Sequence, residues 1–212
     1  MSLADTLKQP KLQGREFGSR PFSRLGGEMY HKTALDNGLR ILTSTMPHTR
    51  SVSLGFFIGV GSRYEADEQG GASHFIEHML FKGTHKRPTS RDVAMAIEGV
   101  GGFINAGTDR EATSFYAKVA HPHLDIAIDV LVDILLNSRL EEEQIEKERR
   151  VIIEEINMSL DAPDEWVHLL SNRLIWPNHP LGRDVAGTKG SVSSLGREAL
   201  VTHLWSYYVP SN

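Results

Sequence analysis

Residues 74–78, His-Phe-Ile-Glu-His, are the residues of this chain best suited to metal chemistry. On a helix with about 100° per residue, Glu77 and His78 lie at about −60° and about +40° from His74, so the three side chains share one face. The two imidazoles are then about one turn apart, which suits neighbouring positions on a single zinc ion. Glu77 stands beside such an ion as a base rather than a ligand, in an inverted form of the His-Glu-x-x-His arrangement.

Two interpretations of this segment are open. A polar helix face can carry two histidines and a glutamate without binding an ion. The neighbouring residues Phe75, Ile76 and Met79 are apolar, however, so the face is not expected to be freely solvated. Buried ionisable groups need partners, and a metal ion is the simplest common one. The pattern therefore favours a metal site.

A catalytic zinc ion needs a third protein ligand, and the predicted helix 141–160 is rich in glutamate. Glu155 is the predicted third ligand, and Glu148, about two turns away, is predicted to support a ligand or to handle protons. Glu154 is expected to face water. In the alternative, both carboxylates pair with a buried lysine or arginine. These predictions rest on one helical stripe, otherwise largely apolar: Glu148, Val151, Ile152, Glu155, Ile156 and Ser159.

Composition narrows the chemistry further. The chain has 212 residues and no cysteine, which excludes a disulfide framework, a zinc ribbon, an iron–sulfur cluster and a thiol nucleophile. Any metal must therefore be held by histidine, aspartate or glutamate. With 23 Lys and Arg against 27 Asp and Glu, the formal net charge is −4, which argues against a nucleic-acid partner.

The first 27 residues read as a polar leader ahead of a domain at 28–212. The leader lacks the apolar core of a signal peptide, and Asp5 and Glu16 interrupt its resemblance to a mitochondrial presequence. The longest apolar run, near residues 54–60, is far shorter than the ~20 residues of a spanning helix. We expect no membrane partner and a bacterial cytoplasmic location.

The elements that position the site are expected to be strands first and helices later. Short strands on either side of the Asn37-Gly38 turn are predicted within 31–42, and a central, well-covered strand at 51–60. A helix follows at 72–81, and another runs from a Ser90 cap to Gly99. Further strands at 103–106 and 113–120 complete a mostly antiparallel sheet.

Four more helices are expected at 122–137, 141–160, 163–176 and 194–208, with a loop at 178–193. In the third of these, the apolar residues at helical spacing (Trp166, Leu169, Leu170 and Leu174) are expected in the core. Strands gathered early and helices gathered late predict an α+β fold, with a mostly antiparallel sheet packed against several helices.

Residues 74–84, HFIEHMLFKGT, resemble the signature of the pitrilysin/insulinase family of zinc peptidases. The resemblance is nearest to the branch that contains mitochondrial processing peptidase and its bacterial relatives. Residues 59–65, 101–108 and 146–156 resemble family stretches in the same order, and the similarity covers about residues 30–212. It implies one half of a clam-shell metallopeptidase that is built from two homologous halves on one chain or two subunits.

The resemblance implies a role for each site residue. His74, His78 and Glu155 would hold one Zn2+ per chain, since the spacing from His78 to Glu155 matches the family pattern. Glu77 corresponds to the base that activates the zinc-bound water, and Glu148 to a second catalytic glutamate.

For the predicted strand 103–106, the resemblance implies substrate binding by Asn105 and Ala106. An extended peptide can add to an edge strand through main-chain hydrogen bonds, without demanding one sequence. The same residues are also compatible with an ordinary hairpin strand.

The leading hypothesis is therefore the catalytic half of a zinc-dependent endopeptidase acting on extended polypeptides. The alternative is a non-catalytic peptide-binding or assembly subunit of the same fold, although such members usually lack part of the His-x-x-Glu-His motif or the distal glutamate. A purely structural metal site would leave Glu77 without a function.

The segment at 207–212 resembles the point where the family chain enters another strand of the same half. Residues 28–212 are therefore predicted to form an N-terminal zinc-peptidase domain that is truncated at its C-terminal end. Its partners would be a peptide substrate and a second homologous half or partner subunit. This predicts zinc binding with weak or absent peptidase activity for the chain alone.

Overall fold

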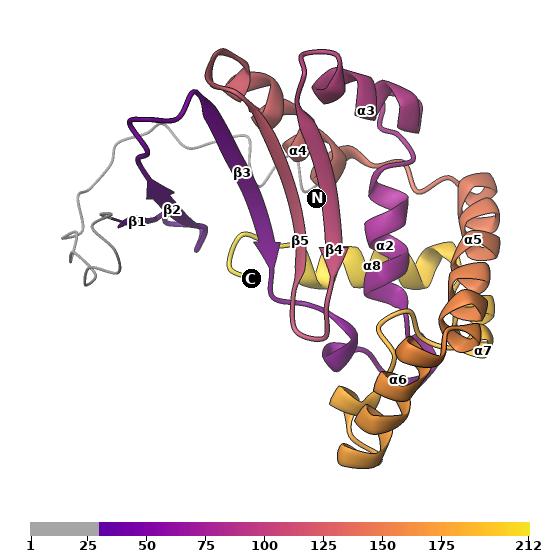
Figure 1. The fold of residues 1–212 in the computed structure, drawn as a ribbon. Coiled ribbons are helices and arrows are strands. Elements are labelled where there is room, and N and C mark those ends of the chain that lie inside the picture. Colours follow the sequence, from indigo (N-terminus) through magenta and orange to yellow (C-terminus); the bar gives the residue numbers. More distant parts are fainter. Residues whose placement is uncertain (1–29) are drawn as a thin grey trace.

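A computed structural model describes residues 30–212, so the predicted leader 1–27 lies outside the described residues. The described part of the chain begins with an antiparallel hairpin of β1 (Tyr30–Ala34) and β2 (Arg40–Ser44), which forms its own two-stranded sheet (Figure 1). Gly38 in the connecting turn has φ 90°, a conformation that favours glycine. The predicted hairpin is confirmed.

Among the residues described, the main sheet has three antiparallel strands in the order β3 (Ser51–Ile58), β5 (Thr113–Ala120) and β4 (Phe103–Thr108), seen side by side in Figure 1. The central strand is β5, and its alternate residues from Thr113 to Val119 are buried. Strand β4 forms one edge of this sheet, as expected of a strand that could accept a peptide.

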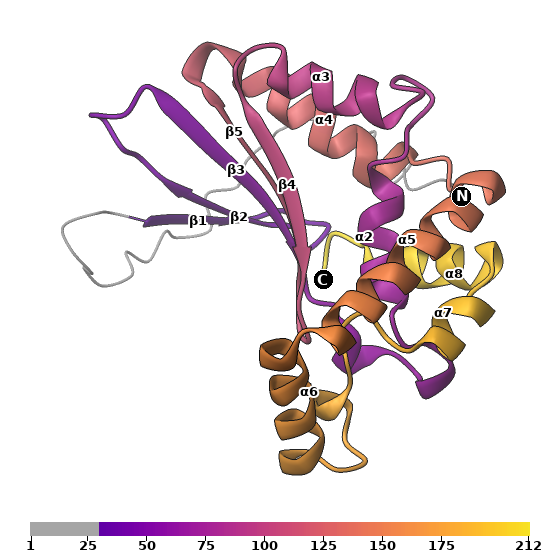
Figure 2. The ribbon, with the colours of Figure 1, turned by 45° about the vertical axis from the view of Figure 1, so that its right-hand side comes forward.

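The prediction that residues 51–60 form a central strand is wrong. In the described sheet β3 pairs only with β5, and its burial alternates along its length. Phe57 is 76% exposed, whereas Ile58 is buried. A run of apolar residues predicts cover on both faces, but the helices of the described chain lie against one face of this sheet (Figure 2).

The helices gather on that face, and α6 extends beyond the end of the sheet (Figure 2). The α+β class is confirmed. None of the helices in residues 30–212 combines the length and the apolar character needed to cross a bilayer. They are α2 (Ala72–Leu80), α3 (Ser90–Glu98), α4 (Leu124–Asn137), α5 (Glu142–Asp161), α6 (Pro163–Ile175), α7 (Lys189–Ser194) and α8 (Arg197–Tyr207).

The core lies between the sheet and the helices. Phe75, Ile76 and Leu80 of α2 have no exposed surface, and neither has Phe115 of β5. Burying such a side chain contributes about 1.5–3 kcal/mol, so packing rather than helix propensity fixes the position of the nine-residue helix α2.

Three predicted features of the helices are corrected. The N-cap of α3 is Thr89 rather than Ser90, because Thr89 forms a reciprocal capping box with Asp92. The predicted loop 178–193 contains most of α7, which begins after Thr188 in a similar box with Ser191. The glycines and the proline of that segment are typical of a loop, so they outweighed the cap signal at Thr188.

Helix α6, which its apolar spacing predicts to lie in the core, does not pack there. No residue of α6 is buried in the described structure, and Leu174 is 80% exposed. The apolar spacing therefore marks one face of a helix that extends away from the sheet, rather than a face in contact with the core.

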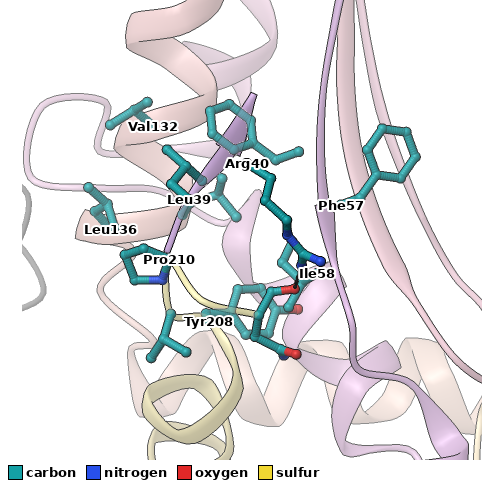
Figure 3. A pocket seen from close by; sticks show the side chains of 12 residues that line it. Leu39, Arg40, Phe57, Ile58, Val132, Leu136, Tyr208 and Pro210 are labelled. Atoms are coloured by element: carbon teal, nitrogen blue, oxygen red, sulfur yellow. Dashed lines mark hydrogen bonds between the residues drawn. The ribbon is translucent and has the colours of Figure 1, made fainter. Parts of the chain in front are cut away.

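An apolar cavity of about 320 Å³ lies between β3, α4 and the last described residues. Figure 3 shows Leu136 of α4, Pro210 and Ile58 around it, with Arg40 and Tyr208 on its wall. None of its lining residues belongs to the predicted metal site. The cavity is therefore separate from the predicted metal site.

Candidate metal centre

Helix α2 begins at a position that only glycine fits. Gly71 has φ 91°, and a Cβ there would lie 2.5 Å from the carbonyl oxygen of Ala186. The buried carboxylate of Glu65 accepts hydrogen bonds from the backbone N–H groups of Gly71 (2.8 Å) and Ser73 (2.7 Å). These bonds satisfy free N–H groups at the helix start, and the negative charge suits the helix dipole.

A second contact fixes the same end of α2 from α8. Ser73 Oγ lies 3.1 Å from Nε2 of His203, and both side chains are buried. Burial lowers the pKa of His203 to about 4, so its imidazole is neutral near pH 7. The residue just before His74 is therefore held by two other segments of the chain.

The structure brings the three predicted metal ligands together where α2 packs against α5 (Figures 1 and 2). His74 Nε2 and His78 Nε2 are 3.1 Å apart, and Glu155 Oε2 lies 3.9 Å from the first and 3.6 Å from the second. Tetrahedral ligands of a zinc ion lie ~3.3 Å from one another, so these separations fit one ion.

The surroundings shift the pKa values of the two imidazoles in opposite directions. Burial, and then the charge of His78, lowers the pKa of His74 to about 4, so His74 is neutral near pH 7. Burial also lowers the pKa of His78, but hydrogen bonding to Glu148 and the charge of Glu155 raise it above its ordinary value overall. Metal ligation requires the neutral form of both rings.

Glu148 supports His78 rather than facing the same space as the ligands. Its Oε1 lies 2.9 Å from His78 Nδ1, and its Oε2 lies 2.6 Å from Lys82 Nζ. When Nδ1 carries the proton, it donates a hydrogen bond to the Glu148 carboxylate. The unprotonated Nε2, with its lone pair, then faces Glu155. Burial raises the pKa of Glu148, but His78 and Lys82 lower it below its ordinary value.

The alternative of pairing with a lysine or arginine therefore applies to Glu148, which pairs with Lys82. Glu155 forms no such ion pair within residues 30–212. Glu154 is exposed, as predicted, and accepts a hydrogen bond from Asn157.

Glu77 is joined to the end of β4. Thr108 Oγ1 donates a hydrogen bond of 2.6 Å to Glu77 Oε2. Burial raises the pKa of Glu77 above its ordinary value, and the Thr108 bond opposes the shift. A carboxylate with a raised pKa is better matched to proton transfer near neutral pH.

Asn105 and Ala106 lie on β4, the same strand as Thr108. The Asn105 side chain is exposed, and its Oδ1 accepts the backbone N–H of Ala106 over 2.9 Å. This N–H is therefore directed away from the ladder to β5. Strand β4 carries a main-chain donor beside the strand end that contacts Glu77.

Sequence reasoning missed four residues that hold this centre in place. Glu65, Lys82 and Thr108 lie inside the stretches that resemble the family. Their place in these stretches could have indicated that they belong to the site. His203 had no such signal, because its partner Ser73 lies in a distant segment and on a different helix.

Comparisons with known proteins identify the family of this chain. The sequence profile of the insulinase family (peptidase family M16) matches residues 40–189. A Bacillus subtilis protein named as an uncharacterized zinc protease is 41% identical over 182 residues, which cover 86% of this chain and 44% of that protein. An Arabidopsis thaliana protein named as a probable mitochondrial-processing peptidase subunit beta is 41% identical over 179 residues. These residues cover 84% of this chain and 34% of that protein.

Solved structures show the same fold. An M16-like peptidase from Alicyclobacillus acidocaldarius matches with a TM-score of 0.80 at 26% identity, covering 90% of this chain and 46% of that one. Pitrilysin matches with a TM-score of 0.77 at 27% identity, and the match covers 92% of this chain and 22% of the pitrilysin chain. This chain thus spans less than half the length of each of these relatives. On the match to residues 40–189, the chain belongs to the insulinase family of peptidases, family M16.

Proposed function

We propose that this chain is the catalytic half of a zinc-dependent endopeptidase. The observation that carries the proposal is the meeting of His74, His78 and Glu155, with the base Glu77 on the same helix as the two histidines. Two imidazoles and one carboxylate are a donor set of catalytic zinc sites, which keep a further position open for water.

The residues fit a zinc ion in chemistry as well as in spacing. His74 is neutral near pH 7, so one of its two ring nitrogens has a free lone pair. Glu148 on Nδ1 of His78 provides the carboxylate–histidine support common beside metal ions, and we assign Glu148 as a positioning residue. One zinc ion per chain is therefore the proposed cofactor.

The reaction proposed is hydrolysis of a peptide bond. When bound, zinc polarises the scissile carbonyl and lowers the pKa of a water molecule. Glu77 accepts the proton as the water oxygen bonds to the carbonyl carbon, and it returns the proton to the amine nitrogen as the carbon–nitrogen bond breaks. Thr108 occupies one oxygen of Glu77, which leaves the other for this proton.

The proposed substrate is an extended polypeptide that pairs with β4. The main-chain donor of Ala106 would exchange its bond to Asn105 for a bond to a substrate carbonyl. Because the chain spans less than half the length of its relatives, we propose a second homologous half or a partner subunit that supplies further substrate contacts. We expect weak or no turnover from this chain alone.

The decisive experiment is the metal content of the purified chain after incubation with zinc and removal of the excess. The wild type should hold one ion, and His74→Ala and Glu155→Gln should hold none. Glu154→Gln is the matched control, because it makes the same chemical change one residue away at an exposed position. If both ligand variants retained stoichiometric zinc, the assignment would be wrong.

A further inference from the structure

Lys82 follows the end of α2 and contacts the buried support of the metal centre. Its Nζ lies 2.6 Å from Glu148 Oε2, while the other oxygen of Glu148 lies 2.9 Å from His78 Nδ1. The Lys82 side chain is 27% exposed and that of Glu148 only 7%. A continuous polar chain therefore runs from an accessible ammonium group to a ligand imidazole.

Glu148 needs this cation. It lies on the buried side of α5 with Ile145 and Ile152, where an uncompensated carboxylate is costly. A neutral imidazole provides a hydrogen bond but no full charge, whereas Lys82 provides both. With one oxygen held by each partner, the carboxylate has a defined position and orientation.

The backbone that carries Lys82 is itself held in place. The Lys82 N–H donates to the carbonyl of Met79 over 3.1 Å, and the N–H of Arg139 donates to the carbonyl of Gly83 over 3.2 Å. Gly83 has φ 126°, a conformation that favours glycine, and Thr84 is fully buried. The ammonium group therefore projects from a fixed turn.

We propose that Lys82 is a positioning residue of the metal centre. By holding Glu148 against Nδ1 of His78, it keeps Nε2 of that ring directed at the ligand atoms of His74 and Glu155. The metal-affinity part of this inference rests on the function proposed above. The part that concerns the imidazole tautomer applies to the metal-free chain.

The first test is zinc affinity, measured by competition with a chelator. Lys82→Met keeps most of the side-chain length without the charge, and it should weaken zinc binding about 10-fold, as loss of a supporting contact does. Lys82→Arg retains the positive charge and should recover most of the lost affinity. Lys86→Met is the control, because Lys86 lies in the same connection between α2 and α3 but pairs with the exposed Asp129 instead.

The second test records nitrogen NMR spectra of the His78 ring in the metal-free chain. At a pH high enough for the ring to be neutral, the wild type should carry its proton on Nδ1, and Lys82→Met should redistribute it between the two nitrogens. Loss of stability alone would leave the tautomer unchanged. Unaltered affinity, or lower affinity with an unaltered spectrum, would overturn the proposal. Failure of the wild type to bind zinc would instead refute the proposed function, and the spectra would still decide the role of Lys82.

Discussion

Thr108, at the end of β4, donates a hydrogen bond of 2.6 Å to Glu77 on α2. The strand proposed to bind substrate is therefore joined directly to the proposed base. A shift of this strand would move the Glu77 carboxylate through this one short hydrogen bond. The position of the base therefore depends on the position of the strand that is proposed to align the substrate.

Thr108→Val should raise the pKa of Glu77 further. Burial already raises this pKa, and the variant removes the hydrogen bond that opposes the shift while keeping the side-chain shape. Carbon NMR titration of labelled glutamate in the metal-free chain would measure the change. Ser114→Ala, which alters a hydroxyl on the neighbouring strand, is the control. An unchanged or lower pKa in Thr108→Val would contradict the argument.

Glu77→Gln should separate metal binding from catalysis. Glutamine preserves the size of the side chain but cannot accept a proton, so zinc content should remain that of the wild type. Any cleavage of an unstructured peptide by the zinc-loaded chain should fall at least 100-fold, the lower range for loss of a general base. Mass spectrometry of the products would measure this. Loss of zinc from Glu77→Gln would show that Glu77 is a ligand instead.

Neighbouring residues of α5 should differ sharply in their effect on stability. Ile152 has no exposed surface, so Ile152→Ala should lower the free energy of unfolding by about 2–5 kcal/mol. Val151 is 45% exposed, and Val151→Ala should cost less than about 0.5 kcal/mol. Urea denaturation would compare the two. Equal losses would mean that the helix presents another face to the core.

His203 should make the metal-free chain sensitive to acid. Its pKa is lowered from 6.5 to about 4 in the folded chain, so the unfolded chain binds more protons between these values. Stability should therefore fall as the pH falls from about 6.5 towards about 4. His203→Gln keeps a hydrogen-bonding group for Ser73 but cannot be protonated.

Between pH 7 and pH 5 the wild type should lose about 2 kcal/mol more than His203→Gln. Urea denaturation at both pH values would measure the difference. The lowered pKa of His74 acts equally in both proteins, so it cancels. His85→Gln, at an exposed position, should behave as the wild type does. The same pH dependence in His203→Gln would exclude His203 as the source.

Residues close in sequence were the most predictable part of the site. The helical period places His74, Glu77 and His78 on one face from their spacing alone, and the same period separates Glu155 from the exposed Glu154. The same period places Val151 on the mostly apolar stripe of α5, but its side chain is 45% exposed. Such a stripe includes positions at the margin of the buried face.

Contacts between distant segments were not predictable in the same way. Strand order depends on which elements meet, so the apolar run of β3 gave no sign of its edge position. The Ser73–His203 contact and the Lys82–Glu148 pair likewise join separate helices or turns. The residues around Lys82 in the sequence do not indicate that it pairs with Glu148.

The proposed ligands come from α2 and α5, and α3, β4, β5 and α4 all lie between these helices in the chain. Neither helix alone supplies the three donor atoms, so the site exists only when α2 and α5 pack together. Such long-range contacts form late compared with local ones. An ion held by all three donors would therefore report that this long-range contact has formed, rather than help to start folding.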